Sequence, residues 1–153
     1  MPPQIAHGRD LRKGRLSEVG RAYLLTVVTN GRCPIFADFQ VGRVLVAAMR
    51  QADVAGRVES LAWVIMPDHL HWLFCLKEGS LGALMRDVKS QTGRQINQVT
   101  GSNQPLWQAG YHDRAIRRDE DLLAVARYVV ANPLRAGLVK RVADYPLWDS
   151  KWL

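Results

Sequence analysis

Residues 63–76 read Trp63-Val-Ile-Met-Pro-Asp-His-Leu-His-Trp-Leu-Phe-Cys-Leu76. Two apolar, aromatic-rich runs flank Met66-Pro-Asp68, which predicts two strands joined by a tight turn, because Val, Ile, Trp and Phe favour strands whereas Pro and Asp favour turns. His69 and His71 open the second strand, and side chains at positions i and i+2 of a strand share one face, with Cα atoms roughly 6.5–7 Å apart. Both imidazoles can therefore bind one metal ion, although a His-x-His triplet also occurs on ordinary strands with one polar face.

The composition indicates one globular domain with an excess of positive charge. The chain has 153 residues, 48% of them hydrophobic, which is enough to bury a core without disulfides. Lys and Arg number 21 against 14 Asp and Glu, a formal net charge of +7, and most of the basic residues are Arg, whose planar guanidinium suits phosphate. Nucleic acid is therefore the first partner to consider, and an ordinary basic surface is the alternative.

Two further classes of protein are disfavoured by the sequence. Cys33 and Cys75 are too few, and too far apart, for a disulfide framework or a thiolate zinc site. No apolar run reaches the roughly 18–20 residues that span a bilayer, and the polar N-terminus does not resemble a signal peptide. We expect a cytoplasmic protein.

The rest of the chain supplies the other elements of an α+β fold. Hydrophobic periodicity predicts strands at 23–29, 57–66, 69–76 and 106–116, the last with a bend at Gly110, and helices at 35–55, 81–97 and 120–132. Ser80 and Asp119 are the expected N-caps of the last two helices, and Pro133 ends the third. The order β-α-β-β-α-β-α predicts a ferredoxin-like sandwich, with a four-stranded antiparallel sheet, helices on one face and the other face open to a ligand.

The two ends of the chain differ in composition from its centre. We divide the chain into a basic N-terminal arm at 1–20, a central domain at 21–140 and a C-terminal aromatic tail at 141–153. The arm would either lie along a phosphate backbone or remain a solvated tail. The aromatic residues of the tail would either close over the domain or stack on bases.

Tyr128 and Asn132 are four positions apart on the third predicted helix and therefore lie on one side of it. Taken singly, a Tyr among valines is a core residue and an Asn before Pro is a turn residue. Together with His69 and His71 they fit a sharper arrangement, with two imidazoles and an amide oxygen around a divalent cation and a phenol beside it. The cation would polarise a phosphodiester, and the Tyr would attack phosphorus to give a phosphotyrosine link.

Several motifs, taken together, resemble those of the HUH-type transposases with a single catalytic Tyr, and most closely the REP-associated tyrosine transposases. The resemblance runs from about residue 14 to 140 and rests on Gly14-Arg-Leu-Ser17, Met66-Pro-Asp-His-Leu-His-Trp-Leu73, Lys89-Ser90, Leu106-Trp-Gln-Ala-Gly-Tyr-His-Asp-Arg-Ala-Ile116 and Ala126-Arg-Tyr-Val-Val-Ala-Asn-Pro-Leu-Arg-Ala-Gly-Leu-Val139. The first strand departs from many relatives, because Tyr23 is not followed by His and the turn after it keeps only Arg32.

The resemblance implies a metal-dependent enzyme that cuts and rejoins single-stranded DNA. It makes His69, His71 and Asn132 the ligands of Mg2+ or Mn2+, and Tyr128 the nucleophile that keeps the 5′ phosphate and leaves a free 3′-OH. Imidazole suits softer ions than Mg2+, which favours Mn2+ in vitro. The implied substrate is the hairpin of repetitive extragenic palindromes, bound by a nucleoid-associated protein that we expect to be a monomer. The candidate DNA contacts are Arg15, Lys89, Arg114, Arg117, Arg118 and Arg135.

Two other functions remain open at this stage. A non-catalytic nucleic-acid-binding module on the same sheet would be indifferent to metal chelation. A metal-dependent phosphoesterase that uses water would leave no DNA attached to the protein. The sequence also does not distinguish a mobile element's enzyme from one fixed in the chromosome.

Overall fold

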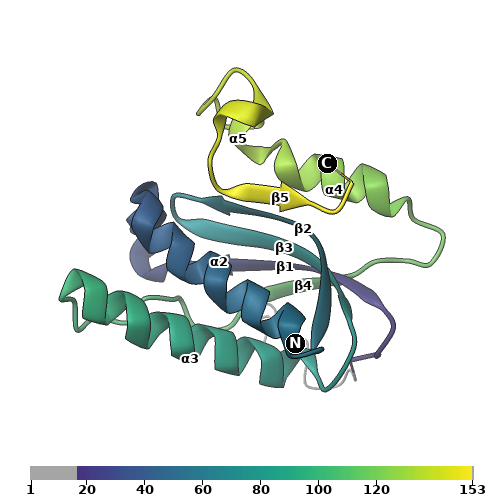
Figure 1. The fold of residues 1–153 in the computed structure, drawn as a ribbon, viewed down its shortest axis with the longest axis horizontal. Coiled ribbons are helices and arrows are strands. Elements are labelled where there is room, and N and C mark those ends of the chain that lie inside the picture. Colours follow the sequence, from purple (N-terminus) through teal and green to yellow (C-terminus); the bar gives the residue numbers. More distant parts are fainter. Residues whose placement is uncertain (1–16, 153) are drawn as a thin grey trace, which may run out of the picture.

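A five-stranded antiparallel sheet lies at the centre of the structure, a computed structural model that describes residues 17–152 (Figure 1). Its strands follow the order β4-β1-β3-β2-β5, and every neighbouring pair is antiparallel. The strands are β1 (Ala22–Val28), β2 (Val58–Met66), β3 (His69–Leu76), β4 (His112–Ala115) and β5 (Trp148–Ser150). The predicted α+β class and antiparallel sheet are confirmed. The sheet has five strands instead of four, because a three-residue segment of the aromatic tail pairs with the outer edge of β2.

The predicted hairpin forms the middle of the sheet. β2 and β3 are joined by Pro67 and Asp68, with Met66 opposite His69 and Trp63 opposite Trp72. β1 pairs with the other side of β3, so β3 has a hydrogen-bonded neighbour on both sides. The strand that carries both imidazoles is thus the central strand of the sheet.

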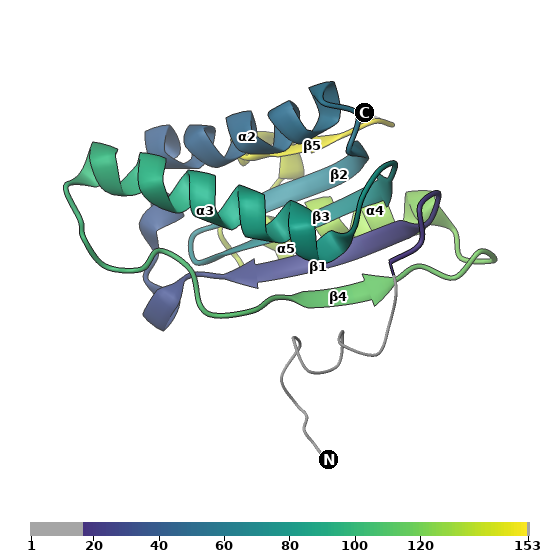
Figure 2. The same cartoon turned by 90° about the horizontal axis from the view of Figure 1, so that it is seen from below.

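Two long helices, α2 (Phe39–Val54) and α3 (Leu81–Thr100), pack side by side on one face of the sheet (Figure 2). The Asp38 side chain accepts hydrogen bonds from two N–H groups at the start of α2, and Ser80 caps α3 as predicted. Leu70, Trp72 and Phe74 of β3 join the core beneath these helices. This face is filled by close-packed apolar side chains.

A second pair of helices, α4 (Leu122–Val130) and α5 (Asn132–Arg135), lies on the opposite face (Figure 1). The expectation that helices occupy one face therefore needs correction. The buried side of α4 presents Ala126, Val129 and Val130, which pack on Val64 and Leu73. Because α2 and α3 already fill the first face, the apolar side of α4 can be buried only on the second. The helix packs on β2, β3 and β5, at one side of that face.

Several element boundaries differ from the predicted ones. Asp121, not Asp119, caps α4 and accepts from the backbone N–H groups of Leu123 and Ala124. The Glu120 carboxylate instead accepts from the backbone N–H of Arg117. The predicted first helix begins as a short 3₁₀ turn, η3 (Ile35–Ala37), because Asp38 caps the α-helix proper. Two other 3₁₀ turns are η2 (Asn30–Arg32) and η4 (Val142–Asp144).

The segment 106–116 was predicted as one strand with a bend at Gly110, but only the part after Gly110 is β4. Gly110 has φ of 76°, a left-handed conformation that interrupts the strand. Before it, Trp107 forms an isolated bridge with Thr29 and donates its indole N–H to Thr92 at 3.0 Å. The first half is therefore held by α3 and by the end of β1.

No helix within residues 17–152 is long and apolar enough to cross a membrane.

The C-terminal residues up to Trp152 return to the sheet, since the Tyr145 hydroxyl donates to the Ile65 carbonyl at 2.6 Å and Leu147 is buried.

Candidate active site

The two imidazoles lie together on the face of the sheet that carries α4. His69 and His71 alternate along β3 with Leu70 and Trp72, which point to the α2/α3 face. Their ring centroids are 4.8 Å apart and the ring planes meet at 83°. The prediction that both rings share one face is confirmed by this geometry.

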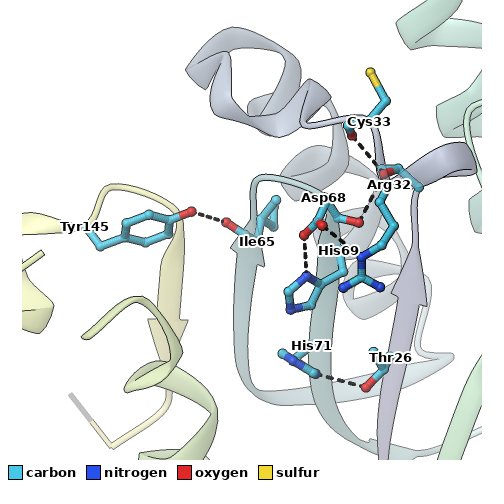
Figure 3. Close-up of polar contacts among 9 residues, drawn as sticks. Thr26, Arg32, Cys33, Ile65, Asp68, His69, His71 and Tyr145 are labelled. Carbon is cyan, nitrogen blue, oxygen red and sulfur yellow. Dashed lines mark hydrogen bonds and ion pairs between the residues drawn. The ribbon is translucent and has the colours of Figure 1, made fainter. Parts of the chain in front are cut away.

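A hydrogen bond fixes one nitrogen of each ring (Figure 3). Nδ1 of His69 lies 2.7 Å from the Asp68 carboxylate, and Nδ1 of His71 lies 2.9 Å from the Thr26 hydroxyl. Thr26 stands directly opposite His71 on β1, so the pairing register places this contact. Since Nδ1 of each ring is engaged, Nε2 is the nitrogen that each offers to a ligand. Such contacts orient metal-binding histidines in proteins.

The turn before His69 is itself held from the β1 side. Thr29 donates its backbone N–H and its hydroxyl to the Asp68 carbonyl, at 3.0 and 3.1 Å. The Arg32 Nε donates to the second carboxylate oxygen of Asp68 at 3.2 Å. Arg32 has φ of 53° and is the one non-glycine with positive φ in the described part of the chain. This backbone conformation is unfavourable for a residue with a side chain, and here it occurs in the residue that contacts Asp68. Asp68 thus bridges a guanidinium and the first imidazole.

The electrostatics of the site favour uncharged imidazole at His71. Burial, followed by the charges of His69 and Arg135, lowers the pKa of His71 from 6.5 to about 4. Burial acts to raise the pKa of Asp68, but the hydrogen bond and charge of His69 and the charge of Arg32 outweigh it, so this pKa is lowered. At neutral pH the site therefore contains an ionised carboxylate and a neutral His71 with a lone pair to donate.

Tyr128 extends from α4 into solvent, although its neighbours Val129 and Val130 are buried. Its side chain is 61% exposed, which excludes the interpretation of Tyr128 as a core residue. The Arg135 guanidinium lies over the Tyr128 ring, with Cζ 3.8 Å from the ring centroid. Arg135 is also one of the positive charges that lower the pKa of His71.

Asn132 begins α5 and is partly buried. Its amide NH2 donates to the Val129 carbonyl at 2.9 Å, which leaves the amide oxygen as the acceptor it can offer. The helix that we predicted to be continuous is interrupted at Ala131, yet Ala131 keeps right-handed helical angles and Tyr128 and Asn132 stay one turn apart. Nowhere in residues 17–152 do three His, Cys, Asp or Glu side chains converge as a metal cluster. A metal here would need the amide oxygen beside the two imidazoles.

The other predicted DNA contacts are distributed around the domain. Arg114 lies on β4, and its guanidinium contacts both carboxylate oxygens of Glu120 at 3.1 Å. Arg117 pairs with Asp119 at 3.2 Å, and Arg118 is exposed. Lys89 lies on α3, on the other face of the sheet, and donates to the carbonyls of Gln108 and Gly110. Arg15 falls outside the described residues. Among the predicted contacts that the structure describes, Arg135 is the one whose charge acts on His71.

Sequence reasoning missed Thr26, Arg32 and Asp68. Asp68 precedes His69 directly, so the Pro-Asp-His order was a usable signal that we interpreted only as a turn. Thr26 is an unremarkable residue of an apolar strand, and only the register of β1 against β3 identifies it. Arg32 was named only as the remaining arginine of the turn after the first strand, and its contact with Asp68 is what connects it to the site.

Comparisons with known proteins find similarity to one group of enzymes. The family described as "Transposase IS200 like" matches residues 19–132. A REP-associated tyrosine transposase of Escherichia coli is 32% identical over 87 residues, which cover 56% of this chain and 50% of that protein. The match thus spans half the length of this relative. A Haemophilus influenzae protein assigned to the same group is 28% identical over 149 residues, covering 90% of this chain and 81% of the relative.

Solved structures extend the similarity to the fold. The structure of a REP-associated tyrosine transposase bound to a REP hairpin superimposes with a TM-score of 0.72 at 27% identity, covering 88% of this chain and 79% of the other. A transposase structure from Deinococcus radiodurans, at 22% identity and a TM-score of 0.56, covers 76% of this chain and 94% of the other and supports the fold alone.

Proposed function

Because the chain belongs to the IS200-like transposase family, we propose that it cuts and rejoins single-stranded DNA at palindromic hairpins, with Tyr128 as the nucleophile. One observation carries the proposal. An exposed phenol stands on α4, a helix that packs on the strand carrying a pair of imidazoles. These imidazoles share one face of the sheet and have their Nδ1 atoms engaged, leaving both Nε2 atoms for a ligand. A core Tyr and two structural histidines would not require this arrangement.

The donors present fit a divalent cation. Nε2 of His69, Nε2 of His71 and the amide oxygen of Asn132 would hold Mg2+ or Mn2+, and the neutral state of His71 near pH 7 suits this role. When bound, such a cation polarises the phosphodiester and offsets the charge that develops on it. Two imidazoles in the donor set favour Mn2+ over Mg2+ in vitro.

The protein's own residues then carry the covalent step. The Tyr128 phenol oxygen attacks phosphorus and loses its proton to solvent. The bond from phosphorus to the 3′ oxygen breaks, and that oxygen takes up a proton to become a free 3′-OH. The phosphate stays on Tyr128 as a 5′-phosphotyrosine, which conserves the ester for rejoining to another 3′-OH.

The substrate is inferred from the relatives and from charge. One similar protein of known structure is bound to a REP hairpin. We propose that this chain takes a comparable hairpin, with residues 1–20 as a basic arm that includes Arg15 and 21–140 as the catalytic unit. Lys89, Arg114, Arg117 and Arg118 would supply positive charge along the phosphates. Such a protein would act at the nucleoid, and we expect it to act as a monomer.

The test incubates the protein with a 3′-labelled palindromic single strand and Mn2+, followed by a denaturing gel, because the 3′ label stays on the fragment that Tyr128 would keep. We expect a covalent protein–DNA adduct that EDTA prevents and that is absent in Tyr128→Phe. Cleavage that persists in Tyr128→Phe would contradict the proposal in favour of a phosphoesterase that uses water. Binding without cleavage or adduct, unaffected by EDTA, would indicate a non-catalytic binding module.

A further inference from the structure

Arg135 lies against Tyr128, and no carboxylate within residues 17–152 neutralises its charge. Arg32 pairs with Asp68, Arg114 with Glu120 and Arg117 with Asp119. Within residues 17–152, by contrast, no Asp or Glu forms an ion pair with Arg135. Its guanidinium rests on the Tyr128 ring instead, at 3.8 Å from the centroid. Its positive charge is therefore available to an anion from outside the protein.

The position of this charge identifies the anion. The guanidinium stacks on the phenol that would attack and is close enough to His71 for its charge to act on that imidazole. Stacking uses the flat face of the guanidinium and leaves its N–H groups, which lie in the plane, to donate at the edge. A group that approaches the phenol beside this guanidinium would meet that edge, and in DNA such an anionic group is a phosphate.

We propose that Arg135 positions the Tyr128 ring and binds the phosphate that Tyr128 attacks. This inference rests on the proposed function and assigns the Arg a task within it. The cation–π contact restricts the rotamers of the exposed Tyr128 side chain, so the phenol oxygen is held near the site before DNA arrives. The same guanidinium offsets the negative charge that grows on the phosphate oxygens as the phenol oxygen bonds to phosphorus and the 3′ oxygen leaves.

A second consequence concerns the protein without DNA. A guanidinium close to His71 repels a divalent cation at the imidazole pair. Removal of the Arg135 charge should therefore tighten the binding of Mn2+ to the free protein while it slows the reaction. A residue with only a structural role would not produce opposite effects on these two quantities.

The experiment compares Arg135→Gln and Arg135→Lys with Arg43→Gln as the matched control. Arg43 is exposed on α2, on the opposite face of the sheet, so its replacement removes the same charge without touching the site. In single-turnover reactions with a labelled hairpin and Mn2+, we expect Arg135→Gln to form the adduct at least about 100-fold more slowly, a loss typical of removing a group that stabilises transition-state charge. Arg135→Lys should fall between it and the wild type, because Lys keeps the charge but not the planar fork.

Two measurements without DNA complete the test. In titration calorimetry Arg135→Gln should bind Mn2+ several-fold more tightly than wild type, and Arg43→Gln should not differ from it. In spectra of the 13C-tyrosine-labelled protein, Arg135→Gln should shift the ring signals of Tyr128, which Tyr128→Phe identifies. Arg43→Gln should leave these signals in place.

The outcomes separate this inference from the function on which it rests. A wild-type protein that forms the adduct, together with an Arg135→Gln variant that forms it equally fast, would overturn the role of Arg135 alone. Unchanged Mn2+ affinity and unchanged Tyr128 signals in Arg135→Gln would overturn it as well. A wild-type protein that forms no adduct under any condition would overturn the proposed function itself.

Discussion

Alternate residues of β3 point to opposite faces of the sheet and have different roles on each face. On β3, Trp72 and Phe74 point towards α2 and α3, are fully buried, and lie with ring centroids 4.7 Å apart. His69 and His71 point towards the other face, which α4 covers only at one side, and there a 61% exposed Tyr128 faces solvent. The first face holds the strand in place by burying apolar surface, and the second presents polar groups at fixed positions beside the apolar patch that α4 covers. A single period-two pattern therefore supplies both stability and chemistry.

The first test of this division compares neighbouring residues of β3. Trp72→Ala removes a fully buried indole, whose N–H also donates to Ser60 at 3.0 Å, and should lower the free energy of unfolding by about 3–5 kcal/mol. His71→Ala removes a hydrogen bond to Thr26 from the less covered face and should cost less than about 1.5 kcal/mol at neutral pH. Urea denaturation of both variants measures the difference. Equal losses would show that the second face contributes as much to stability as the first.

The second test uses pH to isolate the face that carries the imidazoles. The pKa of His71 is about 4 when folded and 6.5 by reference, so between these values the unfolded chain binds a proton that the folded chain does not. In metal-free protein, stability should therefore fall as pH drops from 6.5 to 4, by up to about 3 kcal/mol from this group. Asp68, whose pKa is lowered, adds a loss only below its ordinary value of 3.8.

Urea titrations in EDTA at several pH values measure this dependence. His71→Gln should flatten the curve between pH 6.5 and 4 and leave the loss below 3.8 in place. An unaltered slope in His71→Gln would mean that other groups cause the acid sensitivity.

The third and smallest effect concerns the residues that orient the imidazoles. Asp68→Asn keeps the shape of the turn but removes the charge that His69 and Arg32 contact, and should weaken Mn2+ binding by about 10–100-fold. Asp38→Asn is a suitable control, because Asp38 only caps α2 on the other side of the sheet and Asn also caps helices well. Calorimetric titration of Mn2+ into both variants gives the comparison. Full affinity in Asp68→Asn would show that the carboxylate does not support His69.

The hairpin and the shared face of its two imidazoles could be predicted from sequence because both follow from local periodicity. The location of α4 could not, since it depends on which face of the sheet still has apolar surface to cover. β5 is three residues long and is defined only by the free edge of β2 next to it. The cap of α4 was assigned to the wrong aspartate because Asp119 and Asp121 are equivalent by residue type. In the structure Asp119 pairs with Arg117, and Asp121 caps the helix.

The site could likewise be predicted only in part. Tyr128 and Asn132 were found as a pair because their spacing survives the interruption at Ala131. Thr26 could not be found from sequence, because its role depends on the pairing register, which places it opposite His71. Lys89 and Arg135 were both chosen for their charge, yet Lys89 holds two backbone carbonyls and Arg135 stacks on Tyr128. Charge alone does not distinguish these two uses.

The engagement of Nδ1 in both imidazoles also decides which replacements preserve the reach of each side chain. The terminal polar atoms of Gln extend about as far from the backbone as Nε2 of His, whereas those of Asn extend only as far as Nδ1. In this site Nδ1 faces Asp68 or Thr26, so Asn would reproduce the supporting contact and lose the outward donor. Gln would present an oxygen close to the position of Nε2 and abandon the supporting contact. Of the two amide replacements, only Gln therefore keeps a ligand atom near the position of Nε2.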